Sequence, residues 1–535
     1  MMAPGIHRGF FLNYPTKYFL FTKYSYIVLI KTLYMLKSIS TLAVCLGSLL
    51  CSAQQKAPAP LELKNDSLTI IGQYDHYNHQ PKDEFVLTVF DWTSSYQKKY
   101  ATPIDPSGKF SLTVPFPTAG ELYLDWGRIS EMTIGLPGET IRLYADLDDY
   151  KRPADFTDKS REEWFSRKTK TRFDGANAGF HTSVRLFKRE LTRRTSREQS
   201  EWRNTITSDL VYRDSVMLKL KNDLRFLDEY AQNHPMEPRA KQYLAADLRC
   251  EATSGLSQYS YNLREQKKDA FSPDYMETLD SIRTLVQSAG YYSGDYMTML
   301  RDLKSYAYTV ASGVKSRNTD SVFQLLVTNP AEKEITYTWD VNRTLETSMP
   351  LEPSAIETFE GKVKNPFLRA AIMAKNNALL KLAQDDSMLK DTRLVTSMPE
   401  FTTAEEMLAH IAGQYKGKVI YMDIWGTWCA PCRDQMNYVP ALKQRLKGKD
   451  VVFVYLANNS VEKAWKGAIK QHKLVGDNVV HYNLPREQQG ILEKKYLYGG
   501  WPTYIIIDKE GKYVTNQAPR PSQPDEAVKA ITDLL

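Results

Sequence analysis

Cysteine is scarce in this chain. Five cysteines occur in 535 residues, and two of them lie within the first 53 residues. Small secreted scaffolds that depend on disulfides carry a much denser set, so the size of the chain must supply its core instead. Of the other three, Cys250 stands alone, whereas Cys429 and Cys432 are separated by two residues. This adjacent pair is better explained as catalytic than as structural.

The usual partners of a metal-binding cysteine pair are also missing. No second cysteine pair exists, and no His-x₃₋₅-His pattern follows the first, which argues against a zinc site. The Pro-x-x-x-Thr/Ser-x-x-Cys context that a thiol peroxidase would need is absent as well. A redox dithiol is therefore favoured over half of a zinc site or two unrelated thiols.

Acidic residues are absent from residues 1–53, which carry five basic ones. The formal net charge of +7 therefore falls to +2 for the rest of the chain, too little to indicate nucleic acid as a partner. Within this stretch, residues 35–53 contain a basic start, an apolar run of about twelve residues and small residues before Gln54, as in a secretory signal peptide. Residues 1–34 would then be an over-extended gene start.

Two alternatives concern this leader. An uncleaved N-terminal anchor would bring membrane contact, but the apolar run is shorter than the ~20 residues that a spanning helix needs. Lipidation of Cys51 is disfavoured because the bulky Leu50 precedes it. We expect an exported protein.

The cysteine pair lies where a strand turns into a helix. Residues 419–424 are apolar and rich in β-branched and aromatic side chains, which predicts a buried strand. Residues 432–447 carry apolar side chains at spacings of three and four, which predicts one amphipathic helix. Unpaired N–H groups and the positive end of the dipole at a helix start both favour a thiolate. Pro431 holds the turn.

The hydrophobic pattern divides the chain into three further parts, which predicts a multidomain protein. Residues 61–150 alternate with period two between Gly/Pro turns, which favours a small β-sandwich-like domain. Residues 154–392 change to helical periodicity, and residues 398–535 alternate between strands and helices. His76 and His79 are interpreted as solvated loop residues with no third metal ligand within sequence reach, and Cys250 as an inert packed thiol.

Three motifs in residues 398–535 resemble the thioredoxin superfamily, and within it the exported TlpA/ResA type of thiol-disulfide oxidoreductase. They are WGTWCAPC at residues 425–432, WPT at residues 501–503 and IDKEG at residues 507–511. The resemblance implies a central sheet flanked by helices. It also implies that Cys429 is exposed and attacks, that Cys432 is more buried and resolves, and that Pro502 is a cis-proline beside the dithiol. Substrate-binding candidates are Trp428, Trp501, Pro502 and Thr503.

Two positions test how far the resemblance extends. Asp423, six residues before Cys429, occupies the place of the buried acid of thioredoxins and is a candidate proton acceptor for Cys432; a solvated strand-end aspartate is the alternative. Where the exported type often has a glutamate, this chain has Gln435, which cannot exchange a proton. Asp434 lies one position away and is expected to be solvated.

These observations predict an exported oxidoreductase that reduces or exchanges protein disulfides, with no metal or organic cofactor. Its partners would be disulfide-containing proteins and an upstream thiol electron donor. The pair Ala430-Pro431 favours reduction over oxidation. The β domain followed by helices resembles, by architecture only, extensions of envelope redox proteins, which indicates the periplasm or cell envelope of a Gram-negative bacterium. The rival hypothesis is a binding or assembly protein with an accessory redox domain.

Overall fold

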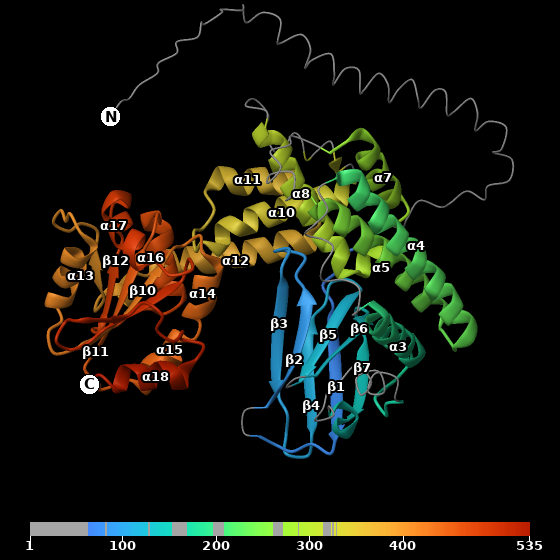
Figure 1. Cartoon of the computed structure of the whole chain (residues 1–535), viewed down its shortest axis with the longest axis horizontal. Coiled ribbons are helices and arrows are strands. Elements are labelled where there is room, and N and C mark those ends of the chain that lie inside the picture. The colour runs from blue at the N-terminus through green and yellow to red at the C-terminus, as the bar shows by residue number, and fades with distance from the viewer. Residues whose placement is uncertain are drawn as a thin grey trace, which may run out of the picture. The chain divides into compact units, whose positions relative to one another are not determined.

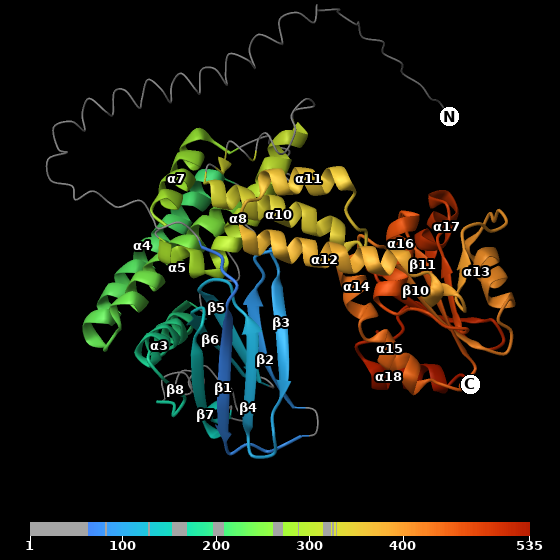
Figure 2. The ribbon, with the colours of Figure 1, turned by 180° about the vertical axis from the view of Figure 1, so that it is seen from behind.

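The computed structural model describes residues 62–80, 83–126, 129–151, 168–195, 208–259, 271–286, 288–313, 323, 326–327 and 329–535. The predicted leader, including residues 35–53, lies outside this set. Within the part of the chain that is described, no helix has both the length and the apolar character needed to cross a membrane. The described residues from Pro60 onward belong to one compact unit, shown in Figures 1 and 2.

Two four-stranded sheets are formed by the N-terminal part of this unit. One has the order β4-β1-β7-β8 and the other β3-β2-β5-β6. The strands are β1 (Ser67–Asp75), β2 (Glu84–Phe90), β3 (Gln97–Pro103), β4 (Lys109–Pro115), β5 (Gly120–Trp126), β6 (Ile129–Gly135), β7 (Thr140–Asp146) and β8 (Arg172–Asp174). Alternate residues of both sheets enter one apolar cluster, as the period-two pattern requires.

Strand β8 lies within residues 154–392, which the sequence predicts to be mostly helical. It pairs antiparallel with β7, with Phe173 opposite Leu143, and Phe173 is buried in the same cluster as the other strands. Three residues are too few to show the alternating hydrophobic pattern of a strand, so this strand could not be recognised within the surrounding helical pattern.

Helices make up the middle of the chain from Ala178 onward. They are α3 (Ala178–Thr195), α4 (Asp209–Asn233), α5 (Pro238–Gln258), α7 (Pro273–Thr284), α8 (Gly294–Gly313), α10 (Pro330–Glu346), α11 (Pro353–Lys362) and α12 (Pro366–Gln384). Local sequence explains their starts: at α12, the Asn365 side chain accepts hydrogen bonds from two first-turn amides, and Pro366 takes the first helical position. Their apolar faces share a core that includes Trp92 of the β region, whose carbonyl accepts the indole N–H of Trp339 at 2.9 Å.

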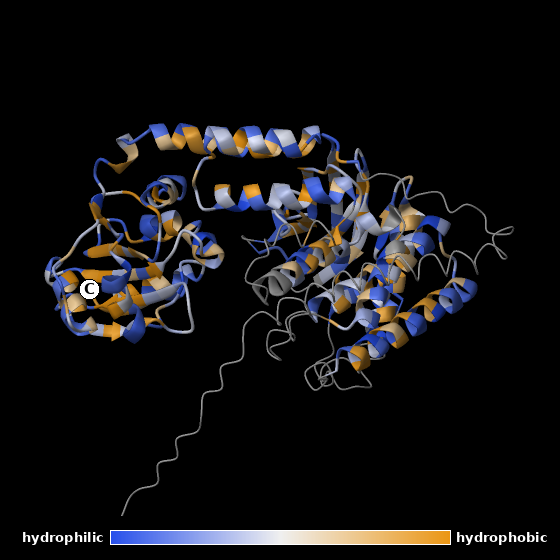
Figure 3. Cartoon of the chain, turned by 90° about the horizontal axis from the view of Figure 1, so that it is seen from above, coloured by the Kyte–Doolittle hydropathy of each residue, from blue (hydrophilic) through white to orange (hydrophobic). Residues whose placement is uncertain are grey.

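The C-terminal part contains a six-stranded mixed sheet of order β14-β13-β10-β11-β12-β9. Its strands are β9 (Arg393–Val395), β10 (Val419–Trp425), β11 (Val451–Ala457), β12 (Val479–Tyr482), β13 (Thr503–Ile507) and β14 (Tyr513–Thr515). The helices are α13 (Ala404–Gly413), α14 (Ala430–Met436), α15 (Val439–Arg445), α16 (Glu462–Gln471), α17 (Arg486–Tyr496) and α18 (Pro524–Thr532). In Figure 3 the strands of this sheet carry the apolar colour.

Every residue of the central strand β10 is buried, because helices cover both faces of the sheet. Val419, Tyr421 and Trp425 pack on the side of α14, α15, α16 and α18. Ile420, Met422 and Ile424 pack on the opposite side, with α13 and α17. The predicted strand-helix alternation is therefore confirmed. Strand β9 extends the sheet to residue 393, ahead of the predicted boundary at 398.

The single helix predicted for residues 432–447 is wrong. Two short helices, α14 and α15, replace it, and the chain turns at Asn437 and Tyr438 between them. Pro440 explains the interruption, since it has no N–H to donate to the carbonyl of Met436 and its ring clashes with a continuing helix. The break leaves α14 as a short helix that has Cys429 as its N-cap and contains Cys432.

Candidate active site

The cysteine pair lies directly after β10, at the start of α14. Cys429 is the N-cap of that helix, and its sulfur accepts a hydrogen bond from the Cys432 backbone N–H at 3.2 Å. The two cysteines form a disulfide, with their Cα atoms 5.3 Å apart. The structure is therefore that of the oxidised form. The same N–H is placed to stabilise a Cys429 thiolate once the bond is reduced.

Both cysteines are buried, which corrects one expectation. Cys432 is 0 % exposed, as predicted for the more buried member, but Cys429 is only 4 % exposed. The neighbouring Trp428, by contrast, is 45 % exposed. Its indole N–H donates to the carbonyl of Asn458 at 3.1 Å, which holds the ring beside the loop.

The second motif meets the first at this point. The Trp501-Pro502 peptide bond is cis, as the resemblance predicted. The ring of Trp501 lies edge-on to that of Trp428, with centroids 5.1 Å apart. The sequence-predicted residues Trp428 and Trp501 are thus brought together although they are far apart in the chain.

Thr503 differs from the prediction that it contacts substrate. It is 2 % exposed, and its hydroxyl is engaged within the chain. The hydroxyl donates to the carbonyl of Gly500 at 2.8 Å and accepts from the N–H of Tyr498 at 3.0 Å. The Thr503 hydroxyl therefore closes the loop that carries Pro502.

Asp423 is buried on the dithiol side of the sheet. Strand alternation places it on the same face as Tyr421 and Trp425, the face that also packs against Cys432. It is 1 % exposed, and neither carboxylate oxygen has a hydrogen-bond partner among the described residues. Burial raises the pKa of Asp423 to about 8, because a charge is poorly solvated there. The alternative of a solvated aspartate is wrong.

Gln435 and Asp434 lie side by side on α14 but differ in their exposure to solvent. The side-chain oxygen of Gln435 accepts the backbone N–H of Ser522 at 3.1 Å, and the side chain is buried. A glutamine thus ties α14 to the segment before α18 without exchanging a proton. Asp434 is exposed, as predicted.

Arg433, which belongs to none of the three sequence motifs, holds the loop around the dithiol. Its guanidinium donates to the carbonyl of Thr427 at 2.7 Å and lies 3.7 Å from a carboxylate oxygen of Glu346 on α10. The first contact is local, and a basic residue next to a cysteine pair is a signal for it. The second joins residues 87 positions apart, and no sequence pattern indicates it.

Cys250 takes no part in this site. It is fully buried in α5 and is a free thiol. Its sulfur lies 3.7 Å from the carbonyl oxygen of Gly290. Burial raises its pKa well above the usual value, so the reactive thiolate is disfavoured, in agreement with the predicted inert packing.

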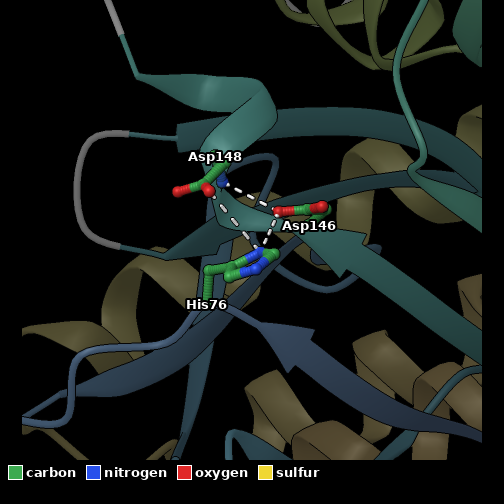
Figure 4. Close-up of side chains that lie close together, drawn as sticks. All are labelled: His76, Asp146 and Asp148. Carbon is green, nitrogen blue, oxygen red and sulfur yellow. Dashed lines mark hydrogen bonds and ion pairs between the residues drawn. The ribbon is translucent and has the colours of Figure 1, made fainter.

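A separate cluster surrounds His76 (Figure 4). Its Nδ1 lies 2.7 Å from Asp146 and 3.6 Å from Asp148, two carboxylates that are far from His76 in the sequence. These three side chains could in principle hold a metal ion. However, Lys170 already supplies a cation to Asp146 at 2.5 Å, and its hydrogen bond lowers the pKa of Asp146. The cluster is thus a self-compensated ion-pair network.

Comparisons with known proteins agree with the geometry of the dithiol site. Residues 417–513 match the model of a family described as thioredoxin-like. The chain is 32% identical over 100 residues to the thiol-disulfide oxidoreductase ResA of Bacillus thuringiensis subsp. konkukian, covering 19% of this chain and 54% of ResA. It is 27% identical over 118 residues to ResA of Geobacillus thermodenitrificans, covering 22% and 64%. The chain thus spans about half the length of the first of these relatives.

Two solved structures are similar to the same region. One is the thioredoxin domain of a thiol-disulfide oxidoreductase from Bacteroides vulgatus, with 24% identity, a TM-score of 0.19 and coverage of 23% of this chain and 81% of the other. The second is a thiol:disulfide interchange protein from a Bacteroides species, with 24% identity, a TM-score of 0.20 and coverage of 22% and 76%.

Proposed function

Because its C-terminal domain is a thioredoxin-like domain of the TlpA/ResA type, we propose that this protein is a thiol-disulfide oxidoreductase acting on protein disulfides through Cys429 and Cys432. One observation carries the proposal: the two cysteines form a disulfide at the start of α14, with the Cys432 amide donating to the Cys429 sulfur. That arrangement supports a nucleophilic Cys429.

The reaction proceeds in two exchanges. The Cys429 thiolate attacks one sulfur of the substrate disulfide, forms a mixed disulfide and releases the other substrate sulfur as a thiolate. Cys432 loses its proton to Asp423, and its thiolate attacks the Cys429 sulfur. The second substrate sulfur then leaves as a thiolate and takes up a proton. Two electrons pass to the substrate, the enzyme disulfide forms, and an upstream thiol donor re-reduces it.

The aromatic pair Trp428 and Trp501, together with Pro502, forms the substrate-facing surface in this proposal. The exposed part of Trp428 offers an apolar contact, and the backbone before the cis-proline offers pairing groups to an extended substrate segment. No metal or organic cofactor takes part in the chemistry.

The finer points of organisation and location belong to the same proposal. Residues 35–53 direct export, so the mature protein begins near Gln54 and works in the periplasm or cell envelope of a Gram-negative bacterium. The two N-terminal sheets pack as a sandwich, which their shared apolar cluster supports. N-terminal sequencing of the protein recovered from the envelope tests the export step.

The activity is tested by insulin reduction with dithiothreitol as the donor. Purified protein should accelerate the reaction, and Cys429→Ser should abolish the acceleration because the attacking thiolate is gone. Cys250→Ala is the matched control, since it removes a thiol that lies outside the site, and it should keep the wild-type rate. Acceleration that survives Cys429→Ser would disprove the assignment.

A further inference from the structure

A cavity of 530 Å³ lies where strands β2 and β3 meet helices α10 and α12. Figures 1 and 2 both show the ends of these strands against α12. Its walls combine polar and charged residues with an aromatic set that includes Phe90, Trp92, Tyr100, Phe116, Tyr291 and Phe367. The volume falls within the range of about 300–1,000 Å³ that is usual for binding pockets, and nothing in the dithiol reaction described above uses it.

Lys375 lines this cavity with an ammonium group that can donate further hydrogen bonds. Its ammonium group donates to the side-chain oxygen of Asn342 at 2.9 Å, and no carboxylate within the described ranges lies at ion-pair distance from it. An ammonium group has three donors, so it retains capacity for a further acceptor. Burial lowers the pKa of Lys375, as expected for a cation that water solvates poorly.

A chain of polar contacts leads from Lys375 to the redox loop. The Asn342 amide donates to Glu346 at 2.9 Å, Glu346 lies 3.7 Å from Arg433, and Arg433 donates to the Thr427 carbonyl at 2.7 Å. Asn342 and Glu346 both line the cavity, whereas Arg433 directly follows Cys432. An occupant of the cavity that contacts Asn342 or Glu346 is therefore connected to the dithiol loop through these polar contacts.

One wall of the cavity comes from an edge strand. Strand β3 pairs only with β2 in its sheet, and Lys98 and Tyr100 of β3 line the cavity. Near the C-terminal end of β3, the Thr102 side chain donates to the carbonyl of Ser111 on β4 at 3.2 Å. Strand β4 therefore covers that end of β3. The remaining edge offers backbone N–H and C=O groups of the kind that pair with an extended peptide.

We propose that this cavity binds an extended apolar or aromatic segment of the disulfide-containing polypeptide, with Lys375 donating to one of its backbone carbonyls. The polar contacts from Asn342 through Glu346 and Arg433 connect such a segment to the dithiol loop, and the segment determines which polypeptides are reduced. A small inorganic anion fits poorly, because it leaves the aromatic walls unfilled and meets the carboxylates of Asp91 and Glu346. The proposal rests on the proposed function and adds a substrate class to it.

The test measures how fast the full-length protein reduces two kinds of disulfide substrate. One is a disulfide-linked peptide with a run of apolar residues beside its cysteine. The other is bis(hydroxyethyl) disulfide, which is too small to span both sites. Lys375→Met removes the donor, and Ala371→Phe fills the cavity from α12. Each variant should lower the ratio of kcat/KM for the peptide to kcat/KM for the small disulfide about tenfold. For Lys375→Met, this is the size expected for the loss of one charged hydrogen bond.

Matched controls come from the same helix. Lys381→Met and Ala374→Phe change exposed positions of α12 that do not line the cavity, and they should leave the ratio unchanged. A peptide with serines in place of the apolar run should be reduced less well by the wild type and should not respond to Ala371→Phe.

The outcomes separate the two proposals. If the wild-type protein reduces neither disulfide, the proposed function fails. If it reduces both, and neither Lys375→Met nor Ala371→Phe lowers the ratio, the cavity is not the binding site. Two independent variants guard against misfolding of one of them. Circular dichroism of each variant shows whether the fold is retained.

Discussion

Asp423 is the single ionisable carboxyl in a strand whose seven residues are all buried. In the register of the sheet it stands between Tyr455 of β11 and Tyr504 of β13, so no cation lies opposite it on these strands. A carboxyl in such surroundings keeps its proton at neutral pH. It can therefore accept the Cys432 proton only in the fraction of molecules that have lost their own, and that fraction grows as the pH approaches 8.

This gives a pH-dependent prediction for Asp423→Asn. In the wild-type protein, resolution of the mixed disulfide by Cys432 should become faster as the pH rises through about 8, because the carboxylate form of Asp423 increases. In Asp423→Asn, resolution at pH 8 should be slower by a factor of about 100, the usual effect of losing a general base. Rapid-quench measurement of the mixed disulfide separates its formation from its resolution.

Asp434→Asn is the matched control, because Asp434 is an exposed aspartate on the cysteine-bearing helix α14. Its resolution rate should equal that of the wild type. Equal slowing of formation and resolution in Asp423→Asn would remove the proposed role of Asp423.

At the scale of elements, α16 and α12 are joined by one buried cation. Lys470 of α16 is 3 % exposed on its side chain. It donates to the carbonyls of Leu382 and Ala383 at 2.9 and 3.1 Å and to Asp386 at 2.8 Å. The last carbonyls of a helix lack intrahelical partners, and a cation there also opposes the negative end of the dipole. All three donors of Lys470 are thus used at the C-terminal end of α12.

Lys470→Met should lower the free energy of unfolding by about 1–2 kcal/mol, because the carbonyl of Ala383 and the carboxylate of Asp386 lose a charged donor at the end of α12. Denaturant unfolding followed by tryptophan fluorescence measures this change. Limited proteolysis should also become faster between α12 and β9, where the end of the helix loses its cap. Lys466→Met, one turn earlier in a partly exposed ion pair, should cost less than about 1 kcal/mol. Equal losses in the two variants would contradict the capping role.

At the scale of the whole molecule, the C-terminal sheet has cores of its own. The two apolar clusters on its faces draw only on residues from Leu389 onward. The sheets and helices before it form other clusters, in which Trp92 of the β region and Trp339 of α10 share one core. The dithiol part therefore carries its own hydrophobic stabilisation, and the remaining chain is attached through polar contacts such as those of Lys470 and Arg433.

A fragment of residues 387–535 should accordingly fold and reduce bis(hydroxyethyl) disulfide at a rate within about threefold of the full chain, since a domain with its own core can fold alone. It should lose the preference for the apolar peptide, because the aromatic cavity is missing. The two rates, measured side by side, check both expectations. A folded fragment with no activity would mean that the preceding helices complete the dithiol site.

The reactive pair, the strands around it and the position of Pro502 could be predicted from the sequence, whereas the division of the following helix into α14 and α15 was not predicted. Each of these predictions depends on residues that are neighbours in the sequence. The cysteine pair lies between a run of β-branched residues and a stretch with helical periodicity, and Pro502 lies in a short motif. For Asp423 the resemblance implied a buried acid, but the sequence left a solvated strand-end aspartate open, and the structure decided between them. Short elements escaped prediction, because three residues of β8 or β9 show no period.

Only the tertiary structure determined which distant side chains meet. The contacts of His76 with Asp146, of Arg433 with Glu346 and of Lys375 with Asn342 join residues that are far apart in the chain. Their spacing carries no signal, since packing of sheets and helices brings them together. Cys429 is buried for the same reason: the strand-to-helix turn is local, but the residues that cover it come from other elements. The chemistry of the dithiol is therefore local, whereas access to it is a property of the folded chain.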